Sequence, residues 1–186
     1  MVWSRRQKVK LKALKGVFPI IFITVIVFAS VGLITWTDSV TADKIEYQKE
    51  QEIKSMLREM FPSMSQYTFE DDIYTIYTDG VEVGYAFLAV GKGYGGDIDI
   101  LVGLEDETTI KAVTIISQSE TPGLGSRIAE SSFAAEFTGV NIDDVSLKQD
   151  GGQVDAITGA TISSRAVIEA VRTTAMEKVK SLKERK

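Results

Sequence analysis

The chain has 186 residues, enough for one domain and one additional element. It contains neither cysteine nor histidine; this excludes disulfides and iron–sulfur or zinc–thiolate ligation by the chain, and it removes the most frequent general base, so redox or group-transfer chemistry requires a bound cofactor. The formal net charge is −5, and subtracting the six cations that precede residue 16 leaves −11 for the rest of the chain, which argues against nucleic acid as a partner.

The first predicted element is a membrane-spanning helix over residues 16–37. None of its residues is ionisable, and at ~1.5 Å per residue the run is long enough to cross ~30 Å of hydrocarbon. Residues 1–15 carry basic charge only, so the positive-inside rule predicts a single-pass protein of the cytoplasmic membrane with a cytoplasmic N-terminus and an extracytoplasmic remainder. A cleaved signal peptide is one alternative, although its apolar core would span only ~7–15 residues. A buried core helix is the other.

A helical stalk is predicted next, over residues 38–62. Its apolar side chains recur at helical spacing and therefore share one face. Pro62 ends this helix, because its ring cannot continue the hydrogen-bond ladder. The residues of the apolar face are Ile45, Ile53, Leu57 and Met60.

The remaining residues, 63–186, predict one α+β domain of antiparallel hairpins and a C-terminal helix. The runs IYTIYT and VEVGYAFLAV form a hairpin around Asp79-Gly80, and DIDILVGL pairs with TIKAVTIISQ. A turn and a short helix follow in SETPGLGSRIAESSFAAEF, and a third short hairpin is expected in VSLKQDGGQVDAI. The last helix, ISSRAVIEAVRTTAMEKVKSL, has valine and alanine at i+4 steps and ends near Leu182.

Directly before that helix stands DAITGATISS, residues 155–164, in which small side chains flank two threonines and two serines. A helix entry of this kind has an ordinary explanation, since threonine and serine cap backbone N–H groups. The same position also suits an anion, because the N–H groups and the dipole of a helix N-terminus favour negative charge. On this motif alone, capping is the favoured interpretation.

Other motifs of the chain change this preference for capping. DAITGAT resembles the flavinylation motif Asp-x-x-(Ser/Thr)-Gly-Ala-Thr of proteins that hold FMN through a phosphoester to the last threonine, here Thr161. The order of an apolar anchor, GYGGDIDILVG, SETPGLGSRI and ITGATISSRAV is similar to the G subunit of the Rnf electron-transport complex. It also resembles the related C subunit of the sodium-pumping NADH:quinone oxidoreductase. The resemblance covers nearly the whole chain in sequence order.

The resemblance implies that a separate, magnesium-dependent flavin transferase moves FMN from FAD to the hydroxyl of Thr161. A threonine hydroxyl needs activation, and without histidine the chain is not expected to modify itself. Asp155 is expected to order the turn or to be recognised by the transferase. The two serines are expected to donate hydrogen bonds to the attached phosphate. The cofactor site predicted around Thr161 includes Thr158, Gly159, Ala160, Ser163 and Ser164.

The resemblance also makes ETPGLG, residues 120–125, part of the flavin pocket. Pro122 fixes φ and the two glycines can adopt positive φ, so the loop is expected to offer N–H groups to the flavin carbonyl oxygens. An ordinary turn before a helix capped by Ser126 is the alternative. Family members often have a histidine where this chain has Gln118, which casts doubt on a proton role there but not on flavin binding. The pocket residues carried over are Glu120, Thr121, Gly123 and Leu124, the last packing on the ring.

The glycine-rich loop GKGYGG, residues 91–96, either relieves a crowded strand crossing or lets a ligand approach the backbone. Tyr94 is a candidate to stack on the isoalloxazine, with packing at the rim as the alternative. Arg127 and Arg165 are candidates to neutralise phosphate, with solvent-facing positions as the alternative. No catalytic residue and no metal site are predicted.

The resemblance implies an electron-carrier subunit of the ion-translocating ferredoxin:NAD oxidoreductase (Rnf) complex, with covalent FMN on Thr161 and other subunits of that complex as partners. No Rossmann strand–turn–helix fingerprint is predicted, so NAD chemistry is expected elsewhere in the complex. The equivalent subunit of the sodium-pumping quinone reductase is the nearest alternative. A membrane-anchored binding module without redox activity is the alternative from another class, and it predicts a colourless protein.

Overall fold

The computed structural model describes the backbone of residues 3–185 and the side chains of residues 18–37 and 48–184. The basic side chains of residues 5–15, and Ile45 on the predicted stalk face, lie outside the described residues. Internal contacts divide the chain into two compact units, Met1–Glu52 and Ile53–Lys186.

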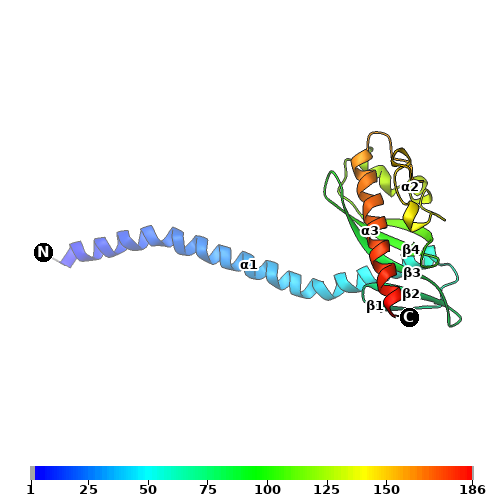
Figure 1. Cartoon of the computed structure of the whole chain (residues 1–186). Coiled ribbons are helices and arrows are strands. Elements are labelled where there is room, and N and C mark those ends of the chain that lie inside the picture. Colours follow the sequence, from blue (N-terminus) through cyan, green and yellow to red (C-terminus); the bar gives the residue numbers. More distant parts are fainter. Residues whose placement is uncertain (1–2, 186) are drawn as a thin grey trace. The chain divides into compact units, whose positions relative to one another are not determined.

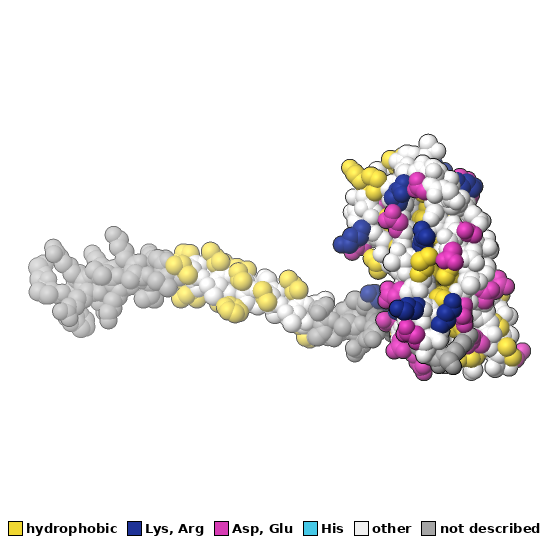
Figure 2. Space-filling model, viewed as in Figure 1, with side chains coloured by type: hydrophobic (Ala, Val, Ile, Leu, Met, Phe, Trp, Pro, Cys, Tyr) yellow, Lys and Arg dark blue, Asp and Glu magenta, His cyan; other side chains and the backbone are white. Residues whose placement is uncertain are grey.

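Helix α1 (Trp3–Met60) contains the predicted membrane segment. Residues Phe18–Thr37 have a mean hydropathy of 2.5 and none of them is buried, and Figure 2 shows hydrophobic side chains along this stretch. The hydroxyls of Thr24, Ser30 and Thr35 each donate to the carbonyl oxygen four residues earlier, at 2.8, 2.8 and 2.9 Å. Polar groups in hydrocarbon need such internal partners, so this helix fits a membrane anchor, as predicted.

Five strands form one antiparallel sheet in chain order: β1 (Gln66–Glu70), β2 (Ile73–Thr78), β3 (Val81–Lys92), β4 (Asp97–Leu104) and β5 (Ile110–Ser117) (Figure 1). The first two predicted hairpins are confirmed, because β2 pairs with β3 and β4 pairs with β5. Asp79 and Gly80 have φ angles of 52° and 81°, which suit a two-residue turn between twisted strands. Strand β1 was not predicted. The fold is α+β, as expected.

Helix α3 (Thr161–Arg185) crosses one face of the sheet (Figure 1). Close approach is possible because Gly91 has no side chain: a Cβ there would lie 2.7 Å from the carbonyl oxygen of Ala166. Towards the other end of the helix, Lys178 Nζ donates to the carbonyl oxygen of Asp71 at 3.3 Å and pairs with Asp72 at 3.7 Å. The predicted apolar stripe of this helix is buried in the main core: Val167, Val171, Ala175 and Val179.

The opposite face of the sheet is partly covered by the last turns of α1. Leu57 and Met60 of this helix, with Phe61 directly after it, form a second apolar cluster. The sheet contributes Ala86 and Leu101 to this cluster, and they alternate with residues that face α3, as the two-residue period of a strand requires. The end of α1 is therefore part of the folded unit. The helix stops at Met60, two residues before the proline that was expected to end it.

The segment between α2 (Ser131–Ala135) and α3 contradicts the predicted third hairpin. It contains two short 3-10 helices, η2 (Ile142–Asp144) and η3 (Lys148–Asp150), and an isolated bridge in which Leu147 and Val154 run parallel. The physical reason is that Leu147 and Val154 both enter the main core side by side in a parallel bridge, whereas the two strands of a hairpin pair antiparallel. Gly151, with a φ of 89°, ends η3 and does not form a hairpin turn.

Candidate functional site

Thr161 is the first residue of α3, as the sequence predicted. The carbonyl oxygen of Ala160 accepts the N–H of Ser164 at 2.9 Å, so residues 161–163 form the first helical turn. Backbone N–H groups of a first turn have no acceptor inside their own helix, and the helix dipole gives this end positive potential. The side chain of Thr161 is exposed there. The local structure thus offers an accessible hydroxyl beside groups that stabilise an anion.

A tight turn presents this hydroxyl. The N–H of Ala160 donates to the carbonyl oxygen of Ile157 at 2.9 Å, and Gly159 occupies the third position of the turn with a φ of 82°. That angle favours glycine. A Cβ at Gly159 would also lie 2.9 Å from Cδ1 of Leu124. The turn therefore requires the glycine, and any larger residue there would also have to displace the side chain of Leu124.

The four hydroxyl side chains of DAITGATISS have different positions. Ser163 and Ser164 are buried, at 2% and 0% exposure. The Ser163 hydroxyl donates to Glu120 Oε2 at 2.5 Å, and Ser164 Oγ accepts the N–H of Ile157 at 3.0 Å. Thr158 and Thr161 are exposed, and of the four only Thr161 and Ser163 line the adjacent cleft. Of the four hydroxyl side chains of this motif, Thr161 is thus the one that is both exposed and part of the cleft lining.

The cleft has a volume of about 420 Å³, within the range of small-molecule sites. Its rim is apolar and open: Tyr94 is 73% exposed, Ile162 59% and Leu124 45%. Figure 2 shows hydrophobic side chains gathered at the end of the domain where α3 begins. The structure brings all three sequence motifs to one place. Lining residues are Tyr94, Glu120, Thr121, Leu124, Gly125, Gly159, Ala160, Thr161, Ile162 and Ser163.

Ile162 was missed by the sequence reasoning. In the helix pattern it reads as one more apolar residue at the start of α3, yet it points out of the core. The available signal was its position, directly after the predicted acceptor and out of step with the buried stripe that begins at Val167.

The ETPGLG loop has less free backbone than expected. Thr121 to Leu124 form a turn in which Gly123 has a φ of 74°. The N–H of Gly123 donates to Ser126 Oγ at 2.9 Å, and the N–H of Leu124 donates to the carbonyl oxygen of Thr121 at 3.2 Å. These two N–H groups are therefore already bonded within the loop. The loop residues that line the cleft are Glu120, Thr121, Leu124 and Gly125, whereas the predicted Gly123 does not line it.

Two of the predicted polar residues lie around the cleft without lining it. Gln118 Oε1 accepts the N–H of Glu120 at 2.6 Å and so orders the start of the loop. Asp155 accepts from Lys148 Nζ at 2.5 Å, and Lys148 also pairs with Glu136 at 3.6 Å. The hydrogen bond to Asp155 is the main cause that raises the pKa of Lys148. Asp155 thus ties η3 to the segment that precedes the acceptor.

The two candidate arginines are also engaged elsewhere. Arg127 pairs with Glu130 at 3.2 Å, and Arg165 pairs with Asp150 at 2.9 Å. Neither lines the cleft, and none of the described residues that do line it is basic. Stabilisation of an anion at Thr161 therefore falls to the N-terminus of α3.

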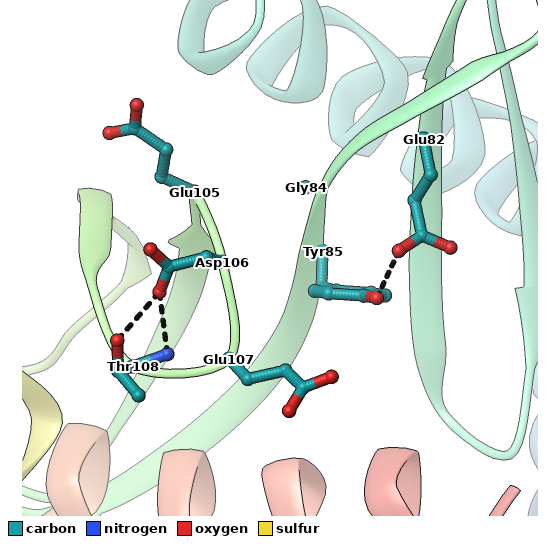
Figure 3. Close-up of a pocket in the computed structure, with 7 residues that line it drawn as sticks. All are labelled: Glu82, Gly84, Tyr85, Glu105, Asp106, Glu107 and Thr108. Atoms are coloured by element: carbon teal, nitrogen blue, oxygen red, sulfur yellow. Dashed lines mark hydrogen bonds between the residues drawn. The ribbon is translucent and has the colours of Figure 1, made fainter. Parts of the chain in front are cut away.

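A second hollow, of about 360 Å³, lies at the other end of the β3–β4 hairpin (Figure 3). It is lined by acidic side chains, but these do not converge on one point. Glu82 accepts from the hydroxyl of Tyr85, and Asp106 accepts from the N–H and hydroxyl of Thr108 at 2.7 and 2.8 Å. Among the described residues no group of three or more acidic side chains could hold a metal ion. The carboxylates of Glu82 and Asp106 in this hollow therefore hold their own strand and loop in place.

Residues 93–175 match the family model of the FMN-binding domain, and this range contains every lining residue of the Thr161 cleft. The fold and the cleft therefore define a protein with an FMN-binding domain. The chain belongs to the family of the G subunit of the ion-translocating oxidoreductase (Rnf) complex. This confirms the resemblance drawn from the sequence motifs.

Family membership is carried by relatives that match most of the chain. The G subunit of the ion-translocating oxidoreductase complex of Aliivibrio fischeri is 32% identical over 77% of this chain and 81% of its own length. The protein of the same name from Methanosarcina acetivorans is 32% identical over 81% of this chain and 89% of its own. The crystal structure of the C subunit of the Na(+)-translocating NADH-quinone reductase from Parabacteroides distasonis is 27% identical, with a TM-score of 0.49 over 57% of this chain and 61% of that one.

Proposed function

We propose that this chain is a membrane-anchored electron carrier of an Rnf-type complex that holds FMN through a phosphoester to Oγ1 of Thr161. One observation carries the proposal: the exposed hydroxyl of Thr161 lies in the cleft at the N-terminus of a long helix, beside exposed apolar side chains. The volume of about 420 Å³ suits a cofactor of this size. FMN, when bound, supplies one- and two-electron transfer.

Attachment of FMN from FAD is a balanced group transfer. The Thr161 oxygen forms a bond to the phosphorus of the FMN half, the P–O–P bond of FAD breaks, AMP leaves and the hydroxyl proton is lost to a base. The described residues of the cleft provide no evident base, because the carboxylate of Glu120 is already bonded to Ser163 and the N–H of Gly95. Activation of the weak threonine nucleophile is therefore assigned to a separate flavin transferase, for which the exposed turn at Thr158 and Gly159 leaves access.

The residues of this chain then have separate roles toward the cofactor. The N–H groups of the first turn of α3 stabilise the phosphate charge. Tyr94, Leu124 and Ile162 provide apolar contact for the ring system, and covering them removes exposed apolar surface from water. The chain contributes the carrier, while its electron donor and acceptor belong to other subunits of the complex.

We expect replacement of Thr161 by alanine to abolish covalent flavin while the fold survives, because this side chain is exposed and outside the core. The full chain would be co-expressed with a flavin transferase and measured by intact mass and by flavin fluorescence in denaturing gels. Thr173→Ala, which changes an exposed threonine of the same helix twelve residues later and outside the cleft, is the matched control and should keep the flavin. Wild-type chain that remains unmodified under these conditions would sink the proposal.

The orientation of the anchor is part of the same proposal: the basic N-terminus is cytoplasmic and the flavin domain extracytoplasmic. Because the natural chain has no cysteine, a single Gln149→Cys substitution on exposed η3 reports the side of the membrane. A membrane-impermeant maleimide should label this variant in intact cells. Labelling only after permeabilisation would place the domain inside and contradict the orientation.

A further inference from the structure

Glu120 is a buried carboxylate that joins all three segments of the cleft. It comes from the ETPGLG loop and is 6% exposed. Its Oε1 accepts the N–H of Gly95 at 2.8 Å, and its Oε2 accepts the hydroxyl of Ser163 at 2.5 Å. The first partner lies 25 residues away along the chain and the second 43 residues away. One side chain therefore bridges the glycine-rich loop and the first turn of α3.

Two nearby glycines leave the space that this carboxylate occupies. A Cβ at Gly93 would lie 2.2 Å from Glu120 Oε1, and a Cβ at Gly125 would lie 2.7 Å from Oε2. Real Cβ contacts are never that short, so both positions exclude a side chain while Glu120 stays in place. The backbone approach predicted for the glycine-rich loop is thus an approach to the protein's own carboxylate.

The local charges also suit a fixed carboxylate. Burial of a charge is costly unless the charge is hydrogen-bonded, and here each oxygen has a donor. Ser163 lies in the first turn of α3, so the carboxylate is held at the positive end of the helix dipole. Hydrogen bonds to charged acceptors are worth more than neutral ones. Glu120 thus belongs to the scaffold of the cleft.

We infer that Glu120 is a positioning residue that holds the Tyr94 loop and the Thr161 turn at a fixed separation before any cofactor is attached. This inference rests on the proposed function of the cleft. Tyr94 stands on one wall, beside Gly95, and Thr161 and Ile162 stand on the other, beside Ser163. Without the bridge the two walls move independently, and the acceptor hydroxyl loses its defined place relative to the apolar rim.

The test compares Glu120→Ala with Glu120→Gln in the full chain, expressed without transferase. Alanine leaves the N–H of Gly95 and the hydroxyl of Ser163 without an acceptor, so hydrogen exchange at residues 93–96 and 161–164 should rise about 10-fold. Glutamine keeps the shape and an acceptor oxygen, so exchange there should stay within about threefold of wild type. Residues 167–179 in the core should be unchanged in both variants.

Flavin attachment gives the second readout. With transferase present, the modified fraction in intact mass should fall in Glu120→Ala and be restored in Glu120→Gln. The matched control is Glu130→Ala, since Glu130 is an exposed carboxylate ten residues later that pairs with Arg127 outside the cleft. It should change neither readout. Should Glu120→Ala fail to fold, Ser163→Ala removes one arm of the bridge and should raise exchange at residues 161–164 alone.

Three results would overturn the inference: unchanged exchange in Glu120→Ala, an equal loss in Glu120→Gln, or a rise spread evenly over the core of α3. The last would mark Glu120 as a general contributor to stability without a specific role in the cleft. The experiment can disprove the proposed function and the positioning role of Glu120 independently of one another. If no variant and no wild-type chain takes up FMN, the proposed function is lost, while the exchange pattern still decides whether Glu120 positions the walls.

Discussion

The β3–β4 hairpin has a hollow at each end, and the two hollows are similar in size but differ in chemistry. Where Lys92 pairs with Asp97, the cleft of about 420 Å³ contains one buried carboxylate, an exposed hydroxyl and an apolar rim. Where Tyr85 pairs with Leu104, the hollow of about 360 Å³ is lined mainly by acidic side chains. At ~3.3 Å per residue the two ends are roughly 23 Å apart.

The difference teaches that volume does not identify the site in this fold. In the acidic hollow, the carboxylates of Glu82 and Asp106 accept hydrogen bonds from neighbours within three residues, so they serve their own strand and loop. In the Thr161 cleft, the single carboxylate joins segments that are distant in sequence. Of the two hollows, only the Thr161 cleft lies at the N-terminus of a helix. We therefore base the proposed site on the exposed hydroxyl of Thr161 at that N-terminus.

The largest expected effect is the loss of stability caused by a matched pair of glycine substitutions, one in each hollow. In the cleft, Gly125→Ala would press a methyl group against Glu120, and in the acidic hollow, Gly84→Ala would place one 2.4 Å from the carbonyl oxygen of Leu104. Each should lower the free energy of unfolding by about 1–3 kcal/mol or more, because both sites are filled. Denaturant titration of the full chain measures this loss.

Only the substitution in the cleft should also change flavin attachment. Among folded molecules, the fraction modified by the transferase should drop for Gly125→Ala and stay at the wild-type level for Gly84→Ala. Equal flavin loss in the two variants would mean that attachment follows stability alone, and the distinction between the two hollows would disappear.

Asp106→Asn gives the smallest expected effect, and it is confined to the acidic end. Hydrogen bonds from Thr108, then those from Thr109, hold the pKa of Asp106 below its ordinary value of 3.8. The folded-state pKa is depressed, so the ionised carboxylate stabilises the fold above its unfolded pKa, and this contribution is lost as pH falls through the folded pKa. Because the group is exposed, the loss at neutral pH should be only about 0.5 kcal/mol.

The measurement is denaturant unfolding of wild type and Asp106→Asn at neutral pH and at successively lower pH. The two curves should converge in the acid range, while the flavin content of both proteins remains equal. A difference in stability that is independent of pH would show that the loop does not depend on the ionised carboxylate.

Local signals predicted much of the fold. The Asp79-Gly80 turn and the i+4 stripe of α3 each depend on residues close in sequence, and both are confirmed. Strand β1 was missed because it is an edge strand of only five residues, and its turn to β2 uses Asp71 and Asp72 at φ angles of 50° and 62°. Such an Asp-Asp turn lacks the glycine that marks most two-residue hairpins.

The cleft was predicted in its motifs but not in its internal order. DAITGAT placed Thr161 at the helix start, as the structure shows. The bond between Glu120 and Ser163 spans 43 residues, so no local pattern contains it. The hairpin expected at residues 145–157 was wrong for a related reason: burial of Leu147 and Val154 against the whole core overrides the turn signal of two adjacent glycines.

Thr161 belongs to a helix of 25 residues that packs along the sheet and is held by Lys178 towards its other end. With FMN attached there, the tether would begin on a rigid element of the domain. Binding of the ring system in the cleft is then an intramolecular step, governed by an effective concentration that the length and stiffness of the tether set. Dilution of the protein, or scarcity of free flavin in the surroundings, would leave the occupancy of the carrier unchanged.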